Sequence, residues 1–239
     1  MRRDRELLAL TEARGAHAGS VLRLFRFEPW GITLGSSQDP ARELDLGRCA
    51  ADGVEWAVRP TGGRAIFHAE EWTYSWVTPI AHPQWGGNLR ESYERIADVL
   101  LASLRELGLE VSRVSRAGRA APPRRATGAA MPCFASTTRH EITRAGRKVL
   151  GSAQRRTRAA LLQQGSLLLS NGHLRLTDYL AVAPAERLAA REGLERGAAH
   201  VGDTLGPDAP LERWADALAK VLPAGVRRVH GPAAFPLTV

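Results

Sequence analysis

The chain contains little lysine and little cysteine. Of its 33 basic residues, all but Lys148 and Lys220 are arginine. The two cysteines, Cys49 and Cys133, stand far apart and provide neither a disulfide framework nor the spacing of metal ligands. We therefore expect reduced thiols and no metal site.

Long hydrophobic runs are absent as well. No stretch approaches the roughly 20 apolar residues of a membrane-spanning helix. The apolar run at 7–10 is too short for a signal peptide, and Glu12 and Arg14 interrupt it. The content of 44% hydrophobic and 24% charged residues is typical of a globular chain. We therefore expect a cytoplasmic protein without membrane contact, folded as one domain over 1–239.

Positive charge is spread along the chain, which has a net charge of +8. The densest basic segment is 113–125, which also contains Pro122, Pro123 and several small residues. This composition is typical of a loop, and we expect a mobile loop over about 112–132. A basic surface suits acidic protein partners as well as it suits nucleic acid, so charge alone does not identify the partner.

The N-terminal half alternates β-favouring segments with turn residues, which predicts short strands. The predicted strands are 21–27, its return at 31–35, 54–59, 65–68 and 73–77. A helix is expected over 40–51, with Asp39 as its N-cap and Pro40 at its first position. Residues 60–64 form a tight turn between the third and fourth strands.

The second half combines one strongly periodic helix with a second group of strands. Apolar residues recur at helical spacing over 89–107, with Asn88 and Glu91 as a capping pair and Gly108 as a terminator. Further strands are expected at 139–144, 148–155 and 160–169, and helices at 183–194 and 211–222 within a helical C-terminal part, 183–239. Groups of strands separated by helices favour an α+β domain with mixed, largely antiparallel sheets.

Lys148 begins the return strand of a predicted hairpin that turns at 144–146. An ammonium is a compact charge that can gain or lose a proton, whereas a guanidinium stays charged and planar. One interpretation is that a surface lysine was retained by chance. The other is that the chemistry at this position requires an ammonium.

The turn at 60–64 holds two adjacent glycines, which let backbone amides approach a ligand. The flanking Arg59 and Arg64 suit an anionic or carbonyl-bearing ligand. The segment is neither a Walker phosphate loop nor a dinucleotide fingerprint. An ordinary hairpin remains the alternative for the turn, and a packed histidine the alternative for His68.

Cys133 ends the basic segment, where nearby cations favour the thiolate. The alternative is a small buried hydrophobic residue, an interpretation that fits Cys49 better because Cys49 lies within the predicted amphipathic helix. The hydroxyls at 136–138 lack the Gly-x-Ser-x-Gly elbow of a serine nucleophile.

Several short motifs occur in order between residues 21 and 169. They are Arg59-Pro-Thr-Gly-Gly-Arg-Ala-x-x-His68, Glu71-x-Thr-Tyr-Ser75, Cys133-Phe134, Gly146-Arg-Lys-Val-x-Gly-Ser-Ala-Gln154 and Gln164-Gly-Ser166. Together they resemble the lipoate protein ligase and octanoyltransferase superfamily, which shares its fold with biotin protein ligases. The cysteine–phenylalanine pair is similar to that of the cysteine-dependent octanoyltransferases.

The resemblance implies an acyltransferase without a cofactor. Cys133 would take an octanoyl group from octanoyl-acyl carrier protein as a thioester, and a lysine of a lipoyl-domain protein would then attack it. Lys148 would hold the thiolate and donate to the acyl carbonyl. The expected substrate-binding residues are Arg59, Thr61, Gly62, Gly63, Arg64, Ala65, His68, Gly151, Ser152 and Ala153. The expected walls of the acyl tunnel include Ile66, Trp72, Trp76 and Val149.

Two positions depart from the family pattern, since Ala69 and Ala135 stand where an acidic residue is common. Three alternatives stay open. The chain could be an ATP-dependent lipoate protein ligase, or an amidotransferase that moves octanoyl between lipoyl domains. It could also be a basic binding module that acts through 113–125, although we expect no nucleic acid partner.

Overall fold

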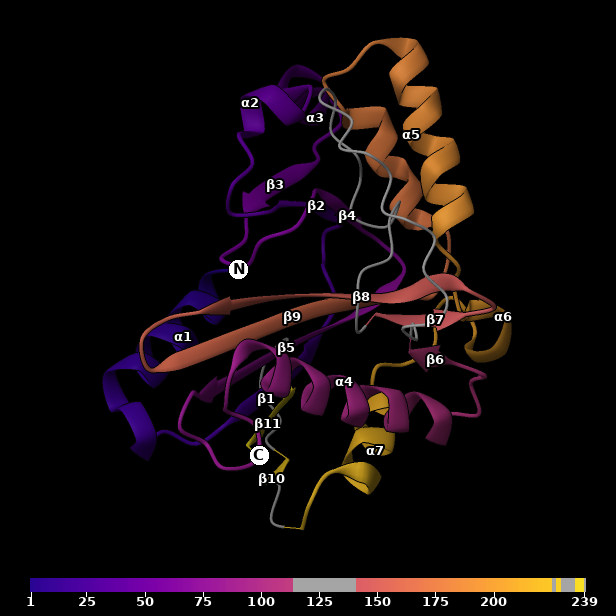
Figure 1. Ribbon diagram of the computed structural model, residues 1–239. Coiled ribbons are helices and arrows are strands. Elements are labelled where there is room, and N and C mark those ends of the chain that lie inside the picture. Colours follow the sequence, from indigo (N-terminus) through magenta and orange to yellow (C-terminus); the bar gives the residue numbers. More distant parts are fainter. Residues whose placement is uncertain (114–140, 225–226, 229–234, 239) are drawn as a thin grey trace.

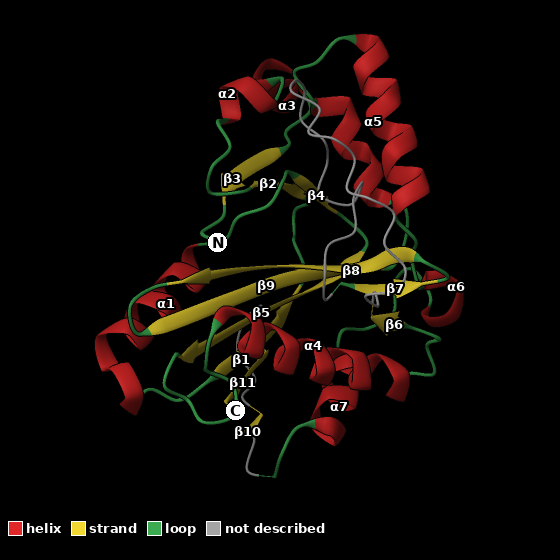
Figure 2. Cartoon of the chain, viewed as in Figure 1, coloured by secondary structure: helices red, strands yellow, loops and turns green. Residues whose placement is uncertain are grey.

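The computed structural model describes residues 1–113, 141–224, 227–228 and 235–238, with side chains up to residue 224. Figures 1 and 2 show a large twisted sheet across the middle of the molecule, with a smaller sheet above it and helices on both sides. The fold is α+β, as the sequence predicted. None of the helices within the described ranges is long and apolar enough to cross a membrane.

The large sheet contains eight strands in the described part of the chain, in the order β10-β11-β1-β5-β9-β8-β7-β6, and its neighbouring strands are antiparallel. Their bounds are β1 Val21–Phe25, β5 Glu71–Pro79, β6 Ser112–Arg113, β7 Ile142–Arg144, β8 Arg147–Arg156, β9 Ala160–Leu168, β10 Arg227–Arg228 and β11 Phe235–Thr238. The small sheet has the order β3-β2-β4, formed by β2 Gly31–Leu34, β3 Glu55–Val58 and β4 Ile66–His68.

The helices cover the two faces of the large sheet. The α-helices are α1 Arg2–Arg14, α2 Pro40–Glu43, α3 Leu46–Ala51, α4 Leu89–Glu106, α5 Pro184–Gly197, α6 Gly202–Leu205 and α7 Glu212–Val221, and the 3-10 helices are η1 Gly15–His17 and η4 Gly172–Tyr179. In Figure 1, α4 and α7 lie below the sheet, while the small sheet and α5 lie above it. We call these the lower and upper faces.

The lower face carries the main hydrophobic core. Trp72, Tyr74 and Trp76 of β5 alternate along the strand with polar residues, and all three pack among the apolar side chains of α4 and α7. Helix α4 begins with the predicted capping box, in which Asn88 and Glu91 bond each other's backbone amides. It is followed by Gly108 at φ 80°, a conformation that glycine adopts without strain.

The sequence suggested that the strand at 31–35 returns alongside the strand before it, and this prediction is wrong. Strand β2 belongs to the small sheet, where it pairs in parallel with β3 and antiparallel with β4. Both edges of β1 are occupied by β5 and β11, so β1 has no free edge for β2. The turn at 60–64 is therefore a crossover between two strands that flank β2, rather than a hairpin.

The predicted helix over 40–51 is two short helices. Asp39 caps α2 as expected, through a hydrogen bond from the Ala41 amide (3.1 Å). Leu44 is extended because it bridges to Leu180, and its side chain is buried in the small core under the small sheet. Asp45 then caps α3, accepting from the Arg48 amide (2.9 Å).

The two ends of the chain differ from the sequence expectation. Helix α1 was not predicted, because its apolar residues are few and only Asp4, Leu8 and Thr11 are buried. The C-terminal part is not helical throughout, since it ends in β10 and β11, which extend the large sheet beside β1. The sequence also did not predict η1, η4, α6 or β6, and β6 occupies the first residues of the segment expected as a loop, of which 114–132 lie outside the described residues. The other helices and strands lie close to their predicted positions.

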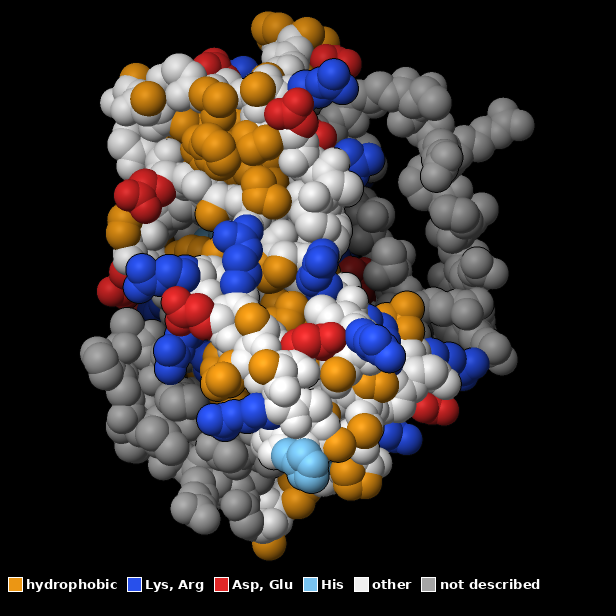
Figure 3. Space-filling view, turned by 90° about the vertical axis from the view of Figure 1, so that its left-hand side faces the viewer, with side chains coloured by type: hydrophobic (Ala, Val, Ile, Leu, Met, Phe, Trp, Pro, Cys, Tyr) orange, Lys and Arg blue, Asp and Glu red, His pale blue; other side chains and the backbone are white. Residues whose placement is uncertain are grey.

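The face on the left of Figure 1 carries mixed charge. Figure 3 shows basic side chains across the middle of this face, interspersed with acidic and hydrophobic ones, and a cluster of hydrophobic side chains above them. Nucleic-acid-binding faces are typically continuous basic patches. The described residues of this face do not form such a continuous basic patch.

Candidate active site

Strand β8 contains one extra residue at Val149. Ile142 of β7 pairs with Leu150, while the next residue, Thr143, pairs with Lys148. An advance of two residues along β8 thus lies opposite an advance of one residue along β7, and this irregularity is a β-bulge. A bulge reverses the alternation of side chains between the two faces. Lys148 therefore lies on the upper face, whereas regular alternation from Leu150 would have turned it into the lower core.

Lys148 forms a buried ion pair with Glu141, the residue before β7. The two side chains are only 2% and 3% exposed. Removing both charges from water is costly, and the cost is offset only when the groups meet in good geometry. Lys148 is thus a buried residue of the upper face and not a solvated surface lysine. The interpretation that a surface lysine was retained by chance is therefore excluded.

Small and polar side chains line the upper face beyond Lys148. Gly151 pairs with Ser166, and Ser166 pairs with Thr73 across three strands. Two residues further along, the row is Ala153, Gln164 and Ser75. Successive rows on one face of a sheet are about 7 Å apart. Small side chains here leave room between the large sheet and the small sheet above it.

A narrow cavity of about 30 Å³ occupies this room. It is lined by Met1, Phe27, Thr33, Arg59, Thr61, Ile66, His68, Thr73, Gly151, Ser152, Ala153, Gln164, Gly165 and Ser166. Although many of these residues are polar, the surface of the cavity is mainly apolar. The polar side chains of the lining form hydrogen bonds with one another. The space between them is therefore suited to an apolar ligand, provided that the walls of the cavity move apart.

His68 is fixed on the cavity wall by both ring nitrogens. Nε2 is 2.6 Å from Oγ1 of Thr33, and Nδ1 is 2.6 Å from Oε1 of Glu71. The ring also stacks on Phe27, with centroids 3.9 Å apart and planes inclined by 14°. The imidazole therefore has one orientation, defined by the small sheet on one side and β5 on the other.

Glu71 is the centre of this hydrogen-bond cluster. Its Oε1 also accepts from the hydroxyls of Thr73 (2.7 Å) and Ser166 (2.9 Å). The side chain is 2% exposed, and its Oε2 has no hydrogen-bond partner within the described ranges. A carboxylate buried among three donors connects β4, β5 and β9 at the cavity.

Arg59 supports the glycine turn from within. Its guanidinium donates to the carbonyls of Gly62 (2.9 Å), Arg64 (2.7 Å) and Thr33 (3.0 Å). The sequence suggested that the guanidinium N–H groups would bind an anionic ligand, but these N–H groups donate to the three backbone carbonyls instead. Arg59 therefore shapes the turn, and its role toward a ligand is indirect.

The glycine turn lies against the end of β2. A Cβ on Gly35 would lie 2.0 Å from the carbonyl oxygen of Gly63, and the Ser36 amide donates to the carbonyl of Thr61 (3.0 Å). No side chain fits between these two backbone segments. The turn is thus held beside the cavity by Arg59 on one side and by Gly35 on the other.

The far end of the cavity is closed by a polar network from α1. Asp4, which is completely buried, ion pairs with Arg23 and accepts from Ser75 (2.7 Å) and Gln164 (2.6 Å). Gln164 in turn accepts from the hydroxyl of Thr61 (3.0 Å). This network fixes the Gln164 side chain at the end of the cavity opposite Lys148.

The expected substrate-binding residues fall into two groups. Those that line the cavity are Arg59, Thr61, His68, Gly151, Ser152 and Ala153, and those that do not are Gly62, Gly63, Arg64 and Ala65. The hydroxyl of Ser152 contacts Tyr74 (2.7 Å) on the lower face, where burial raises the pKa of Tyr74 to about 12. Cys133 lies outside the described residues.

The expected acyl-tunnel walls are only partly right. Ile66 lines the cavity, but Trp72, Trp76 and Val149 belong to the core on the lower face. Strand alternation places the two tryptophans there, and the bulge places Val149 there. Cys49 is buried as predicted, and burial raises the pKa of its thiol.

Several residues of the site were not singled out from the sequence. Phe27, Thr33, Gln164, Ser166 and Glu141 all touch the cavity or the lysine. Gln164 and Ser166 stood in a motif, but no chemistry was assigned to them. The sequence did not indicate Glu141 as a residue of the site, because its ion pair with Lys148 depends on the register of the hairpin and on the bulge.

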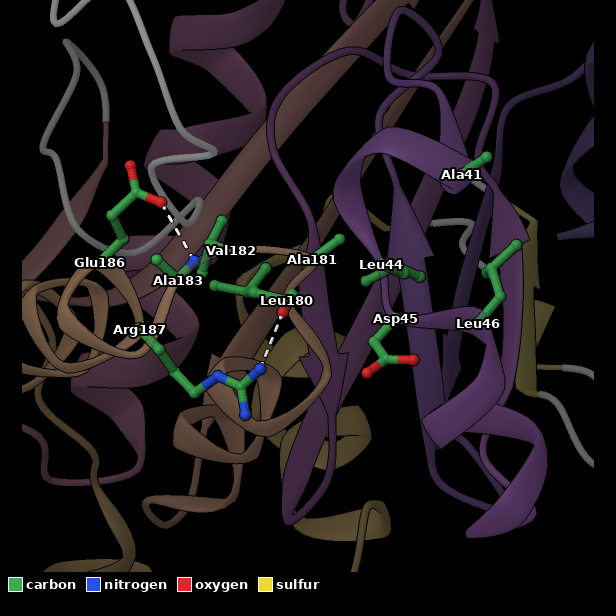
Figure 4. Close-up of a pocket in the computed structure, with 10 residues that line it drawn as sticks. All are labelled: Ala41, Leu44, Asp45, Leu46, Leu180, Ala181, Val182, Ala183, Glu186 and Arg187. Carbon is green, nitrogen blue, oxygen red and sulfur yellow. Dashed lines mark hydrogen bonds between the residues drawn. The ribbon is translucent and has the colours of Figure 1, made fainter.

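Another hollow lies away from these residues, between the α2–α3 segment and the start of α5 (Figure 4). Its polar groups serve local structure: Glu186 accepts from the Ala183 amide (3.2 Å), and Arg187 donates to the Leu180 carbonyl (3.2 Å). None of the sequence motifs contributes a residue to it. Across the described ranges, no group of three His, Cys, Asp or Glu residues could hold a metal.

Comparison with known proteins gives a consistent result. Residues 2–223 match the model of the lipoyl protein ligase A/B catalytic domain. Octanoyltransferase LipM of Carboxydothermus hydrogenoformans is 36% identical over 194 residues, which cover 80% of this chain and 70% of that protein. Octanoyltransferase LipM of Kyrpidia tusciae is 34% identical over 219 residues, covering 90% of this chain and 78% of that protein.

A solved structure supports the same fold. It contains a bi-partite lipoate protein ligase and its E2 lipoyl domain from Thermoplasma acidophilum. The match has a TM-score of 0.68 at 19% identity and covers 92% of this chain and 77% of that one. At this identity the likeness concerns the fold alone.

Proposed function

Because the chain belongs to the lipoyl protein ligase A/B catalytic domain family, we propose that it is an octanoyltransferase of lipoate assembly that works through a thioester on Cys133. The donor is octanoyl-acyl carrier protein, and the acceptor is a lysine of a lipoyl-domain protein. The relatives described above are octanoyltransferases, which supports octanoyl as the transferred group.

The observation that carries this proposal is the position of Lys148. Its ammonium is buried, paired with Glu141, and turned by the bulge onto the same sheet face as the apolar cavity. A fixed cation beside an apolar pocket suits a reaction in which negative charge develops on the carbonyl oxygen of a fatty acyl group. The acyl chain would lie along the rows of Gly151 and Ala153, toward Gln164.

The reaction consists of two acyl transfers. In the first, the Cys133 thiolate attacks the carbonyl carbon of the donor thioester, and the bond to the donor sulfur breaks, so that the donor leaves as a thiol after taking up a proton. In the second, the neutral amine of the acceptor lysine attacks the new thioester. The bond to Cys133 breaks, the thiolate is restored, and the nitrogen loses a proton as the amide forms.

His68 and Arg59 have supporting roles in this proposal. His68 forms one wall of the acyl site, in an orientation fixed by Thr33 and Glu71. Arg59 keeps the glycine turn beside the cavity, so that Thr61 at its start lines the acyl site. Neither role requires a metal or a nucleotide.

The test is to mix the purified protein with octanoyl-acyl carrier protein and measure its intact mass. We expect an adduct of one octanoyl group without ATP, no adduct in Cys133→Ala, and transfer of the group to a lipoyl domain. An adduct that persists in Cys133→Ala contradicts the cysteine mechanism. Product that forms only with ATP identifies a ligase, and a preference for octanoyl-lipoyl domains as donors identifies an amidotransferase.

A further inference from the structure

A groove of about 520 Å³ opens at the tip of the β7–β8 hairpin, against the end of α5 and the segment that leads into α6. It is lined by Arg144, Ala145, Arg147, Asn171, Leu174, Glu195, Ala198, Ala199, His200 and Asp203. In Figure 1 these elements lie together on the right, with the end of α5 above β7 and β8. The groove is separate from the cavity, with which it shares no lining residue.

The wall of the groove is attached to Lys148. The Ala199 amide donates to the Lys148 carbonyl (2.9 Å), and Ala198 forms a parallel bridge with Lys148. Along β8, Arg147 lines the groove and Gly151 lines the cavity. Lys148 therefore stands between the two hollows, within a few residues of each.

The groove carries an uncompensated positive charge. Its two acidic residues are engaged by arginines, Asp203 by Arg144 (2.5 Å) and Glu195 by Arg191 (3.1 Å). Arg147, by contrast, is exposed and has no carboxylate partner in the described part of the chain.

His200 adds a second free polar group. Its Nδ1 is buried and has no hydrogen-bond partner within the described ranges. Asn171, also on the groove wall, offers an exposed side-chain amide. The groove can thus provide one full positive charge and several hydrogen bonds to an extended polar ligand.

The two hollows differ in the chemistry that they accept. The surface of the cavity is mainly apolar, whereas the groove is mainly polar and contains Arg147 without a carboxylate partner among the described residues. A substrate that joins an apolar chain to a polar, anionic arm through a reactive carbonyl would place that carbonyl beside Lys148. An octanoyl thioester of phosphopantetheine has this composition, because its arm carries two amides and ends in a phosphate.

We propose that this groove binds the phosphopantetheine arm of the donor, with its phosphate on Arg147. A guanidinium can donate two parallel N–H groups to phosphate oxygens, which gives both charge and direction. Asn171 and His200 hydrogen-bond the polar groups of the arm. The inference rests on the proposed function, which supplies the donor.

The experiment compares two small donors, octanoyl-phosphopantetheine and octanoyl-pantetheine, which differ only in the phosphate. The rate of octanoyl adduct formation on the enzyme is measured by intact mass at donor concentrations below saturation. We expect the wild type to prefer the phosphorylated donor. Arg147→Gln should lower the rate with that donor about tenfold and leave the rate with the other nearly unchanged.

A second variant tests the groove without removing a cation. Asn171→Asp has nearly the same shape and adds a negative charge beside the proposed phosphate site, so it should reduce the rate with the phosphorylated donor more than the rate with octanoyl-pantetheine. The matched control is Arg90→Gln, which removes an exposed arginine from α4 on the lower face and should change neither rate.

The outcomes separate the groove from the function. An adduct that forms at equal rates with both donors, or variants that slow both donors equally, overturns the groove assignment and leaves the proposed function in place. The absence of an adduct from any donor, octanoyl-acyl carrier protein included, overturns the proposed function and the groove with it.

Discussion

Glu141, the residue before β7, forms an ion pair with Lys148, the second residue of β8, with almost no access to solvent. A buried pair of this kind rarely adds stability beyond what apolar side chains of the same size would give. The presence of this buried pair is therefore better explained by the role of the Lys148 ammonium than by a gain in stability. The ion pair with the carboxylate holds the ammonium in one place on the upper face.

Replacing Glu141 with glutamine should weaken both fold and activity. The change leaves the buried ammonium without its carboxylate, which typically lowers the free energy of unfolding by about 3 kcal/mol. Octanoyl transfer should fall as well, because the ammonium loses the carboxylate that fixes its position on the upper face. Urea unfolding and the intact-mass assay measure the two effects.

The double variant Glu141→Leu with Lys148→Met separates structure from chemistry. It removes both charges, so we expect it to recover the free energy of unfolding lost by the single variant. Adduct formation should remain absent or slow. A double variant that is as unstable as Glu141→Gln would show that the pair does not behave as an isolated ionic contact.

Replacing Lys148 with arginine should reduce transfer by about a hundredfold, comparable to the loss of one oxyanion donor. The guanidinium is larger and planar, and the site is closed on all sides. The chain offers a matched control in its other lysine, since Lys220 is exposed and pairs with Glu106 (2.6 Å). Lys220→Arg should behave as wild type, and wild-type activity in Lys148→Arg would mean that an ammonium is not required.

The close approach of Gly35 to the glycine turn gives a further prediction. Gly35→Ala places a methyl group against the Gly63 carbonyl, so the turn must shift, at a cost of about 2 kcal/mol in stability. Adduct formation should slow because the turn contains Thr61, which lines the cavity. Gly62→Ala is the control, since a Cβ there meets open space and the fold should lose less than about 0.5 kcal/mol.

His173 should make the protein less stable in mild acid. Burial lowers its pKa to about 4, against the opposing effects of the Ser170 backbone and Glu71, and His200 lowers it further. Between that value and about 6.5 the unfolded chain binds a proton that the folded chain does not, so stability rises with pH in this window. Wild type should lose about 2 kcal/mol more than His173→Gln between pH 7 and pH 5, measured by urea unfolding.

Local sequence signals predicted most of the elements correctly. Helix α4 followed from its apolar spacing and capping pair, and the β7–β8 turn followed from Ala145 and Gly146, which both have positive φ. These features depend on neighbouring residues, so the sequence contains the information. Helix α1 has no such signal, because its few buried side chains are held by contacts with β5 and β9.

Long-range pairing was harder to predict. Strand β2 follows β1 closely in sequence, yet β1 is enclosed by β5 and β11, and the choice between these partners depends on the whole sheet. The same holds for the site. The motifs identified Lys148, His68 and the glycine turn, but the Glu141 partner and the expected walls Trp72 and Trp76 depended on register and face.

Strand β1 has a consequence for how the chain folds. It pairs at residues 21–24 with β11 at residues 235–238, so the first strand meets its second partner more than 200 residues later. Such distant pairing slows folding, because a long loop must close before the contact is gained. During synthesis, one edge of β1 therefore stays open until residues 235–238 have left the ribosome, and β11 can add to the large sheet only then.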